Sequence, residues 1–215
     1  MDSENSDIKI IGSNNDSANI ELVNSKSKKY KLKAKVVGDT LKIEVDRKWF
    51  NWFSIDFFSS TTLMNVQLPD RLLGKINVET NNGSINISKL ETKDIHTETD
   101  NGEVFIKDVK SNSMYVQSDN GKLFFENIEG KIYGESDNGD ISLNTHILNE
   151  PIEFQTDNGS ITITTKKDPE NVMINVETDN GKINVFGKSN PSTVFGNGDH
   201  IIKLTSDNGD ITVQN

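Results

Sequence analysis

A four-residue pattern recurs seven times in this chain of 215 residues: Ser or Thr, then Asp or Asn, then Asn-Gly. Its glycines are Gly83, Gly102, Gly121, Gly139, Gly159, Gly181 and Gly209, at intervals of 19, 19, 18, 20, 22 and 28 residues. A repeat of about 20 residues is typical of a solenoid, in which each repeat packs only against its neighbours. An elongated stack is therefore expected.

Apolar residues alternate with polar ones on both sides of each turn. Ile76 and Val78 precede the first turn, and Ile85 and Ile87 follow it. This period of two predicts strands, and no stretch has the period of a helix. Asn-Gly between strands is also typical of hairpins, but the other half of each repeat has only weak turn signals. The favoured fold is therefore all-β, a single-stranded right-handed parallel β-helix (β-solenoid) whose successive turns stack about 4.8 Å apart.

Continued alternation predicts the orientation of each turn residue. The Ser or Thr points inward, the Asp points outward, and the Asn points inward before a glycine with positive φ. Inward Asn side chains on successive coils could bond to each other as an amide ladder. The alternative is that Asn itself takes the left-handed conformation and faces solvent.

The N-terminal third is less regular than the rest. Residues 1–70 are expected to form an irregular β segment and cap, and residues 71–215 a β-solenoid of seven coils, within one continuous structural domain. The stretch from Trp49 to Phe58 contains both tryptophans and four phenylalanines. It is interpreted either as a cap over one end of the solenoid or as an exposed surface for a partner or lipid.

Three segments carry a family resemblance: Gly38 to Ile43, Val66 to Pro69, and the repeated Asp-Asn-Gly-x-Ile-x-Ile. Together they resemble the bacterial putative-adhesin family, the domain of unknown function numbered 4097, over nearly the whole chain from Ile8. The resemblance implies a right-handed β-helix and a loose link to the cell envelope and to adhesion or envelope stress. It implies no enzyme and no catalytic residue.

Composition narrows the possible partners. The formal net charge is -10 and no sizeable basic cluster occurs, which argues against nucleic-acid binding. The absence of cysteine excludes disulfides and thiolate metal sites, and no cofactor is expected. The chain has no apolar run of about 18 residues, so no transmembrane segment is expected. Residues 1–6 do not resemble a signal peptide. The expected location is the cell surface or extracellular space if an export signal has been removed, and otherwise the cytoplasm.

Stacked repeats turn sequence positions into columns, one of which is acidic. The weak candidates for a metal site are Asp100, Asp119, Asp137, Asp157, Asp179 and Asp207. Carboxylates are calcium ligands, so a row of weak calcium sites is one interpretation. In the favoured alternative, each Asp accepts hydrogen bonds from amides of its own turn.

A second set of columns breaks the repeat with aromatic residues. Phe105, Tyr115, Phe124 and Tyr133 are expected to face outward on successive coils and to form a partner or packing patch. The internal partner considered is the stretch from Trp49 to Phe58.

No catalytic constellation is apparent, because the three histidines occupy different repeat positions and none pairs with a nucleophile. The predicted function is a non-catalytic, adhesin-like or scaffold module of the bacterial cell envelope, with an unknown envelope, glycan or protein partner. The alternative is a carbohydrate-active enzyme or glycan-binding module on a β-helix.

Overall fold

The computed structural model describes residues 1–3, 6–23, 30–47, 62–69, 71 and 73–215, and these residues form strands and turns without a helix. The strands are β1 (Asp2–Ser3), β2 (Ser6–Ser13), β3 (Asn19–Val23), β4 (Tyr30–Val37), β5 (Thr40–Arg47), β6 (Thr62–Pro69), β7 (Leu73–Thr80), β8 (Ile85–Thr99), β9 (Val104–Ser118), β10 (Leu123–Ser136), β11 (Ile141–Thr145), β12 (Ile152–Thr156), β13 (Ile161–Thr165), β14 (Val172–Thr178), β15 (Ile183–Val185), β16 (Ser192–Phe195), β17 (His200–Ser206) and β18 (Ile211–Gln214). The prediction of an all-β protein is confirmed.

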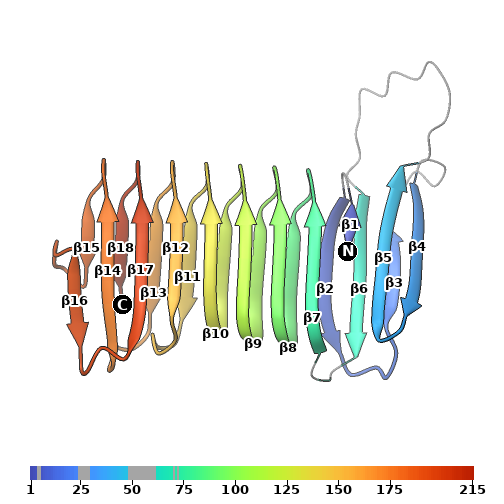
Figure 1. Ribbon diagram of the computed structural model, residues 1–215, viewed down its shortest axis with the longest axis horizontal. Helices are drawn as coiled ribbons and strands as arrows, with labels where there is room; N and C mark the ends of the chain where they lie inside the picture. The colour runs from blue at the N-terminus through green and yellow to red at the C-terminus, as the bar shows by residue number, and fades with distance from the viewer. Residues whose placement is uncertain (4–5, 24–29, 48–61, 70, 72) are drawn as a thin grey trace, which may run out of the picture.

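The strands form two faces that run along the long axis of the molecule (Figure 1). Face A contains, in spatial order, β6, β2, the first parts of β8, β9 and β10, and then β11, β13, β18 and β15. Face B contains β5, β1, β7, the later parts of β8 to β10, and then β12, β17 and β14. All these neighbours pair in parallel, so equivalent residues of successive coils lie side by side.

The parallel stack is flanked by antiparallel strands, so the sheet as a whole is mixed. β3 pairs with β6 and β4 with β5 at one end, and β16 pairs with β14 at the other. A strand of reversed direction at the end of a stack covers the edge that the last coil would otherwise expose. The right-handed, single-stranded parallel β-helix therefore remains a prediction for the coils alone.

Each of the long strands β8, β9 and β10 passes from face A to face B at a residue with positive φ. These residues are Lys89 (φ 55°), Asp108 (φ 53°) and Asn127 (φ 52°), and none is a glycine. Left-handed backbone is unfavourable for residues with a Cβ, although Asn and Asp tolerate it best. The side chains of this corner bond along the stack, because Asn127 Nδ2 donates to Asp108 Oδ1 at 2.9 Å.

The core lies between the two faces and consists of inward apolar columns. Ile85, Ile87, Val104 and Ile106 of face A are fully buried. The two largest buried side chains, Phe125 of face A and Phe154 of face B, stack with ring centroids 5.3 Å apart. Side chains that face outward from face A and from face B therefore lie on opposite sides of the stack.

The spatial order of the coils differs from the sequence order at both ends of the chain. β17 lies between β12 and β14, and β18 lies between β13 and β15. The last coil therefore lies between two coils that precede it in the sequence. In the same way β1 lies between β5 and β7, and β2 between β6 and β8. The expectation that each coil stacks on the next in sequence is therefore wrong at the ends. The extra residues before Gly209 contain β16, which runs back along β14.

Candidate functional site

The inward residue of each turn is a hydroxyl that binds the neighbouring coil. Thr99 Oγ1 donates to the Gly83 carbonyl oxygen at 3.2 Å, and Ser118 Oγ donates to that of Gly102 at 3.0 Å. Ser136, Thr156, Thr178 and Ser206 donate to turn-glycine carbonyls in the same way, and Thr80 Oγ1 donates to the Ser6 carbonyl oxygen at 3.4 Å. Because buried hydroxyls need a partner, this bond explains why Ser or Thr opens every copy of the repeat.

The turn glycines do not have positive φ, so that prediction is wrong. The glycines with positive φ are Gly38, Gly130, Gly187, Gly196 and Gly198. A Cβ on Gly121 would instead lie 1.8 Å from the Gly102 carbonyl oxygen, and a Cβ on Gly102 would lie 1.9 Å from that of Gly83. Glycine is required at the turns because backbones of neighbouring coils approach each other too closely for any side chain.

The third residue of the turn forms an amide ladder along this edge of the stack. Asn101 Nδ2 donates to Asn82 Oδ1 at 2.8 Å, and Asn120 Nδ2 donates to Asn101 Oδ1 at 2.9 Å. In spatial order the ladder runs through Asn82, Asn101, Asn120, Asn138, Asn158, Asn208 and Asn180. These side chains are exposed, so the ladder forms but the predicted inward orientation is wrong.

The six candidate metal-binding aspartates follow the same edge as an exposed or half-buried column, comprising Asp100, Asp119, Asp137, Asp157, Asp179 and Asp207. The expected hydrogen bonds from amides of their own turn are not formed by these carboxylates among the described residues. Burial and the neighbouring charges of Asp137 and Asp100 raise the pKa of Asp119 above its usual value. In the described part of the chain, no group of three or more acidic or histidine side chains could hold a metal ion. Calcium binding by this column stays a prediction.

Another aspartate position, directly after the turn glycine, has a clear structural role that the sequence analysis missed. Asp140 Oδ1 accepts a hydrogen bond from the Ser160 backbone N–H at 3.1 Å, and Oδ2 accepts one from Lys122 Nζ at 2.9 Å. The bond from Lys122 and the bond from Ser160 lower the pKa of Asp140. Asp210, which follows Gly209, and Asp7, which follows Ser6 at the aligned position, accept the equivalent backbone bond from the neighbouring coil.

Three aromatic rings are stacked on the outside of face B. The rings of Tyr115 and Tyr133 lie 4.7 Å apart and nearly parallel, and His96 stacks on Tyr115 at 4.9 Å. Each tyrosine hydroxyl donates to the side chain two residues later, Tyr115 to Gln117 at 3.0 Å and Tyr133 to Glu135 at 2.7 Å. Burial, together with the bond to Glu135, raises the pKa of Tyr133 above its usual value. We call His96, Tyr115 and Tyr133 the face B ring row.

The two phenylalanines of the predicted patch lie on the other side of the molecule. Phe105 and Phe124 project from face A, half-buried, with ring centroids 6.0 Å apart. The structure thus separates the four predicted residues into two pairs and adds His96 to the tyrosine pair. His96 occupies the equivalent repeat position, which is the sequence signal for it. The stretch from Trp49 to Phe58, considered as their internal partner, lies outside the described residues.

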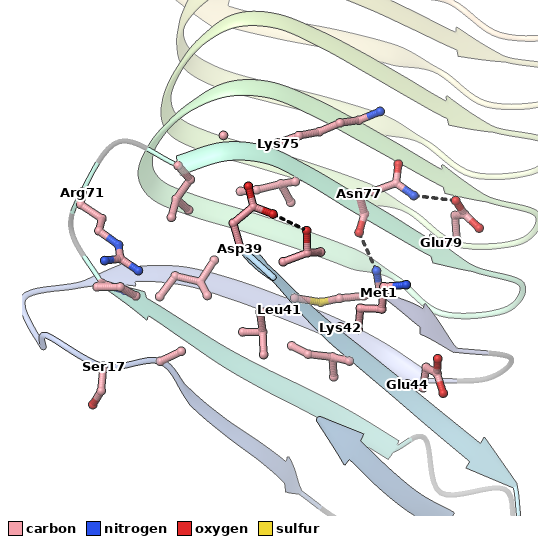
Figure 2. A pocket seen from close by; sticks show the side chains of 18 of the residues that line it. Met1, Ser17, Asp39, Leu41, Lys42, Glu44, Arg71, Lys75, Asn77 and Glu79 are labelled. Carbon is pink, nitrogen blue, oxygen red and sulfur yellow. Dashed lines mark hydrogen bonds between the residues drawn. The ribbon is translucent and has the colours of Figure 1, made fainter. Parts of the chain in front are cut away.

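A cavity of about 1000 Å³ lies on face B between β5 and β7 (Figure 2). Its floor is apolar and includes Leu41, Ile43 and Ile76, while Lys42 and Lys75 stand on its rim. At one end the Met1 amino group donates to the Asn77 carbonyl oxygen at 2.7 Å. This cavity could not be predicted from the sequence, because it depends on the insertion of β1 between two strands that are distant in the chain. We call it the β5–β7 slot.

No helix in the described ranges is long and apolar enough to cross a membrane. The histidines lie apart: His96 belongs to the ring row, His146 is exposed near the end of β11, and His200 begins β17.

A family model described as Toastrack DUF4097 matches residues 1–134 and 129–214. Two crystal structures are similar to this chain. One is of a "putative adhesin" from Bacteroides fragilis NCTC 9343, with 16% identity, a TM-score of 0.49 and coverage of 100% of this chain and 90% of that one. The other is of a "putative cell adhesion protein" from Clostridium sporogenes ATCC 15579, with 12% identity, a TM-score of 0.34 and coverage of 99% and 90%. No curated protein matches the sequence.

Proposed function

Because the chain belongs to the Toastrack DUF4097 family, we propose that it is a non-catalytic, adhesin-like or scaffold module associated with the bacterial cell envelope. The observation that carries this proposal is the face B ring row, since it interrupts an otherwise repetitive surface. A residue needed only for stacking recurs in most coils, whereas these three rings occupy adjacent coils alone.

The repeated polar residues support a rigid display surface. Hydroxyls, amides and the aspartates after glycine bond from coil to coil, so most repeated groups of the turn edge are used within the stack. The rows of outward side chains on the two faces are therefore held in fixed register. A partner that contacts several coils would meet a preorganised surface, which lowers the entropic cost of binding.

The geometry of the ring row favours binding of a polypeptide or another hydrogen-bonding partner over binding of a sugar ring. Its rings are parallel and less than 5 Å apart, so their faces cover one another and their edges point outward. A pyranose ring stacks on an open aromatic face, and Tyr115, which lies between His96 and Tyr133, offers none. Repeated carboxylates likewise do not single out a catalytic pair. The alternative of a carbohydrate-active enzyme or glycan-binding module is thus the weaker proposal.

We also propose that the coils wind in the right-handed sense, as parallel crossovers nearly always do. Residues 1–70 and 71–215 are proposed to form one continuous domain, since β2 pairs with β8 across that boundary. The proposed location is the cell surface or extracellular space if an export signal has been removed, and otherwise the cytoplasm.

Binding to isolated bacterial envelope, measured by co-sedimentation, tests the proposed function. We expect the protein to bind, and the double variant Tyr115→Ser/Tyr133→Ser to bind about tenfold more weakly, because two anchors of the ring row are lost. Phe105→Ser/Phe124→Ser is the matched control on face A and should bind like the unchanged protein. Equal binding by all three proteins, or release of reducing sugar from the envelope, would contradict the proposal.

A further inference from the structure

The amide ladder ends at Asn180, in the turn that connects β14 to β15 at one end of the stack (Figure 1). Asn180 Nδ2 donates to Asn208 Oδ1 at 3.0 Å, but Asn180 Oδ1 accepts no hydrogen bond from a described residue. Gly181, the next residue, is exposed, whereas the other six turn glycines are buried or half-buried. This turn is therefore held by a neighbouring turn on one side only.

An inner turn with nearly the same local sequence is held on both sides. Residues 118–122 and 178–182 both consist of Ser or Thr followed by Asp-Asn-Gly-Lys. Asn120 Nδ2 donates to Asn101 Oδ1 at 2.9 Å, and Asn120 Oδ1 accepts a bond from Asn138 Nδ2 at 2.9 Å. The two turns thus differ in their place in the stack and hardly at all in their covalent chemistry.

The ladder opposes a reaction to which Asn-Gly is prone, the attack of the glycine nitrogen on the asparagine side chain. To reach that nitrogen, the side chain of Asn120 must break two ladder bonds, whereas that of Asn180 must break one. Local opening also costs least at the end of a stack, where the fewest contacts hold the backbone. We propose that Asn180 is a site of spontaneous deamidation in the folded protein, and that the reaction then passes inward along the ladder to Asn208.

The reaction needs only water as a second reactant. The Gly181 nitrogen, which donates to no described residue, loses its proton and bonds to Asn180 Cγ. The bond from Cγ to Nδ2 breaks, and Nδ2 leaves as ammonia. Water then opens the succinimide ring to aspartate or isoaspartate, so that the net change is hydrolysis of one amide to one carboxylate. Glycine permits the ring closure because it has no side chain to obstruct the approach.

The polarity of the ladder gives the reaction a direction. In every bond, Nδ2 of one turn donates to Oδ1 of the turn nearer to β7. A carboxylate at position 180 has no Nδ2 to donate, so Asn208 Oδ1 loses its donor and Asn208 becomes the new end. At the opposite end, a carboxylate at position 82 still accepts the bond from Asn101 Nδ2. The site lies apart from the ring row, and its test does not depend on the proposed function.

Peptide mapping by mass spectrometry, after incubation of the folded protein at mildly alkaline pH, measures conversion at each asparagine. We expect Asn180 to be converted about tenfold faster than Asn120, because the end turn opens more often. In urea the unfolded chain should convert the two residues at similar rates, since their neighbours in the sequence are nearly the same. Equal rates in the folded protein, or the same excess at Asn180 in urea, would overturn the proposal.

Two aspartate variants test the direction of the reaction. Asn180→Asp is expected to accelerate conversion of Asn208 about tenfold, because Asn208 is then held on one side only. Asn82→Asp is the matched control at the other end and should leave the conversion rate of Asn101 unchanged. Asn197, which precedes a glycine outside the ladder, is the internal reference and should convert at one rate in all three proteins. An unchanged rate for Asn208 in Asn180→Asp, or a faster rate for Asn101 in Asn82→Asp, would overturn the proposal.

Discussion

Replacing Gly121 by alanine is expected to lower the free energy of unfolding by about 3 kcal/mol. The added Cβ would lie 1.8 Å from the Gly102 carbonyl oxygen and 2.5 Å from its carbon. That carbonyl cannot move away freely, because it accepts the bond from Ser118 Oγ at 3.0 Å. The variant must therefore separate two coils or break that bond, and each change propagates to the neighbouring turns.

Gly74→Ala is the matched control, because no atom lies within 4 Å of a Cβ built there and its φ is not positive. Its free energy of unfolding should stay within about 0.5 kcal/mol of that of the unchanged protein. Urea denaturation of the three proteins measures both values. A Gly121→Ala variant as stable as Gly74→Ala would show that the coils are farther apart than the structure has them.

Phe125→Ala is expected to cost about 3–5 kcal/mol, since the ring is fully buried and stacks on Phe154 across the two faces. The adjacent Phe124→Ala should cost less than about 1 kcal/mol. Phe124 faces outward and is half-buried, and its ring centroid lies 6.0 Å from that of Phe105. The two residues are adjacent in the face A part of β10, and they differ in that the Phe125 ring points into the core whereas the Phe124 ring points outward.

The same denaturation experiment distinguishes the two phenylalanines. A smaller loss for Phe125→Ala than for Phe124→Ala would reverse the assignment of inward and outward residues in the first part of β10. The predicted order of the two losses therefore checks which residues of face A point into the core.

Local patterns predicted much of the coil from sequence. The alternation around each turn gave the inward columns correctly, from Ile76 and Val78 to Ile211 and Val213. The inward Ser or Thr and the existence of an amide ladder also followed from the repeat. These features depend on residues within one turn, or on the same position in the next coil, so a single sequence contains the information.

Features set by contacts between distant segments were not predictable in this way. The close approach that requires the turn glycines comes from the neighbouring backbone, and positive φ occurs instead at Lys89, Asp108 and Asn127. The prediction of one patch for the four aromatic residues is wrong because the bend at these three positions places the two tyrosines and the two phenylalanines on opposite faces. The insertion of β1 and β17, and with it the β5–β7 slot, depends on pairing between strands that are not consecutive.

Disulfide formation between engineered cysteines tests the spatial order of the coils most directly, because the chain has no cysteine of its own. Gln155 pairs directly with Thr205, whereas Glu177 lies one strand farther along face B. Direct partners are about 4.8 Å apart and second neighbours about twice that, beyond the reach of a disulfide of about 7 Å. We predict that Gln155→Cys/Thr205→Cys forms an intramolecular crosslink under mild oxidation and that Gln155→Cys/Glu177→Cys does not. Crosslinking of the second pair in place of the first would show that the coils stack in sequence order and would contradict the account.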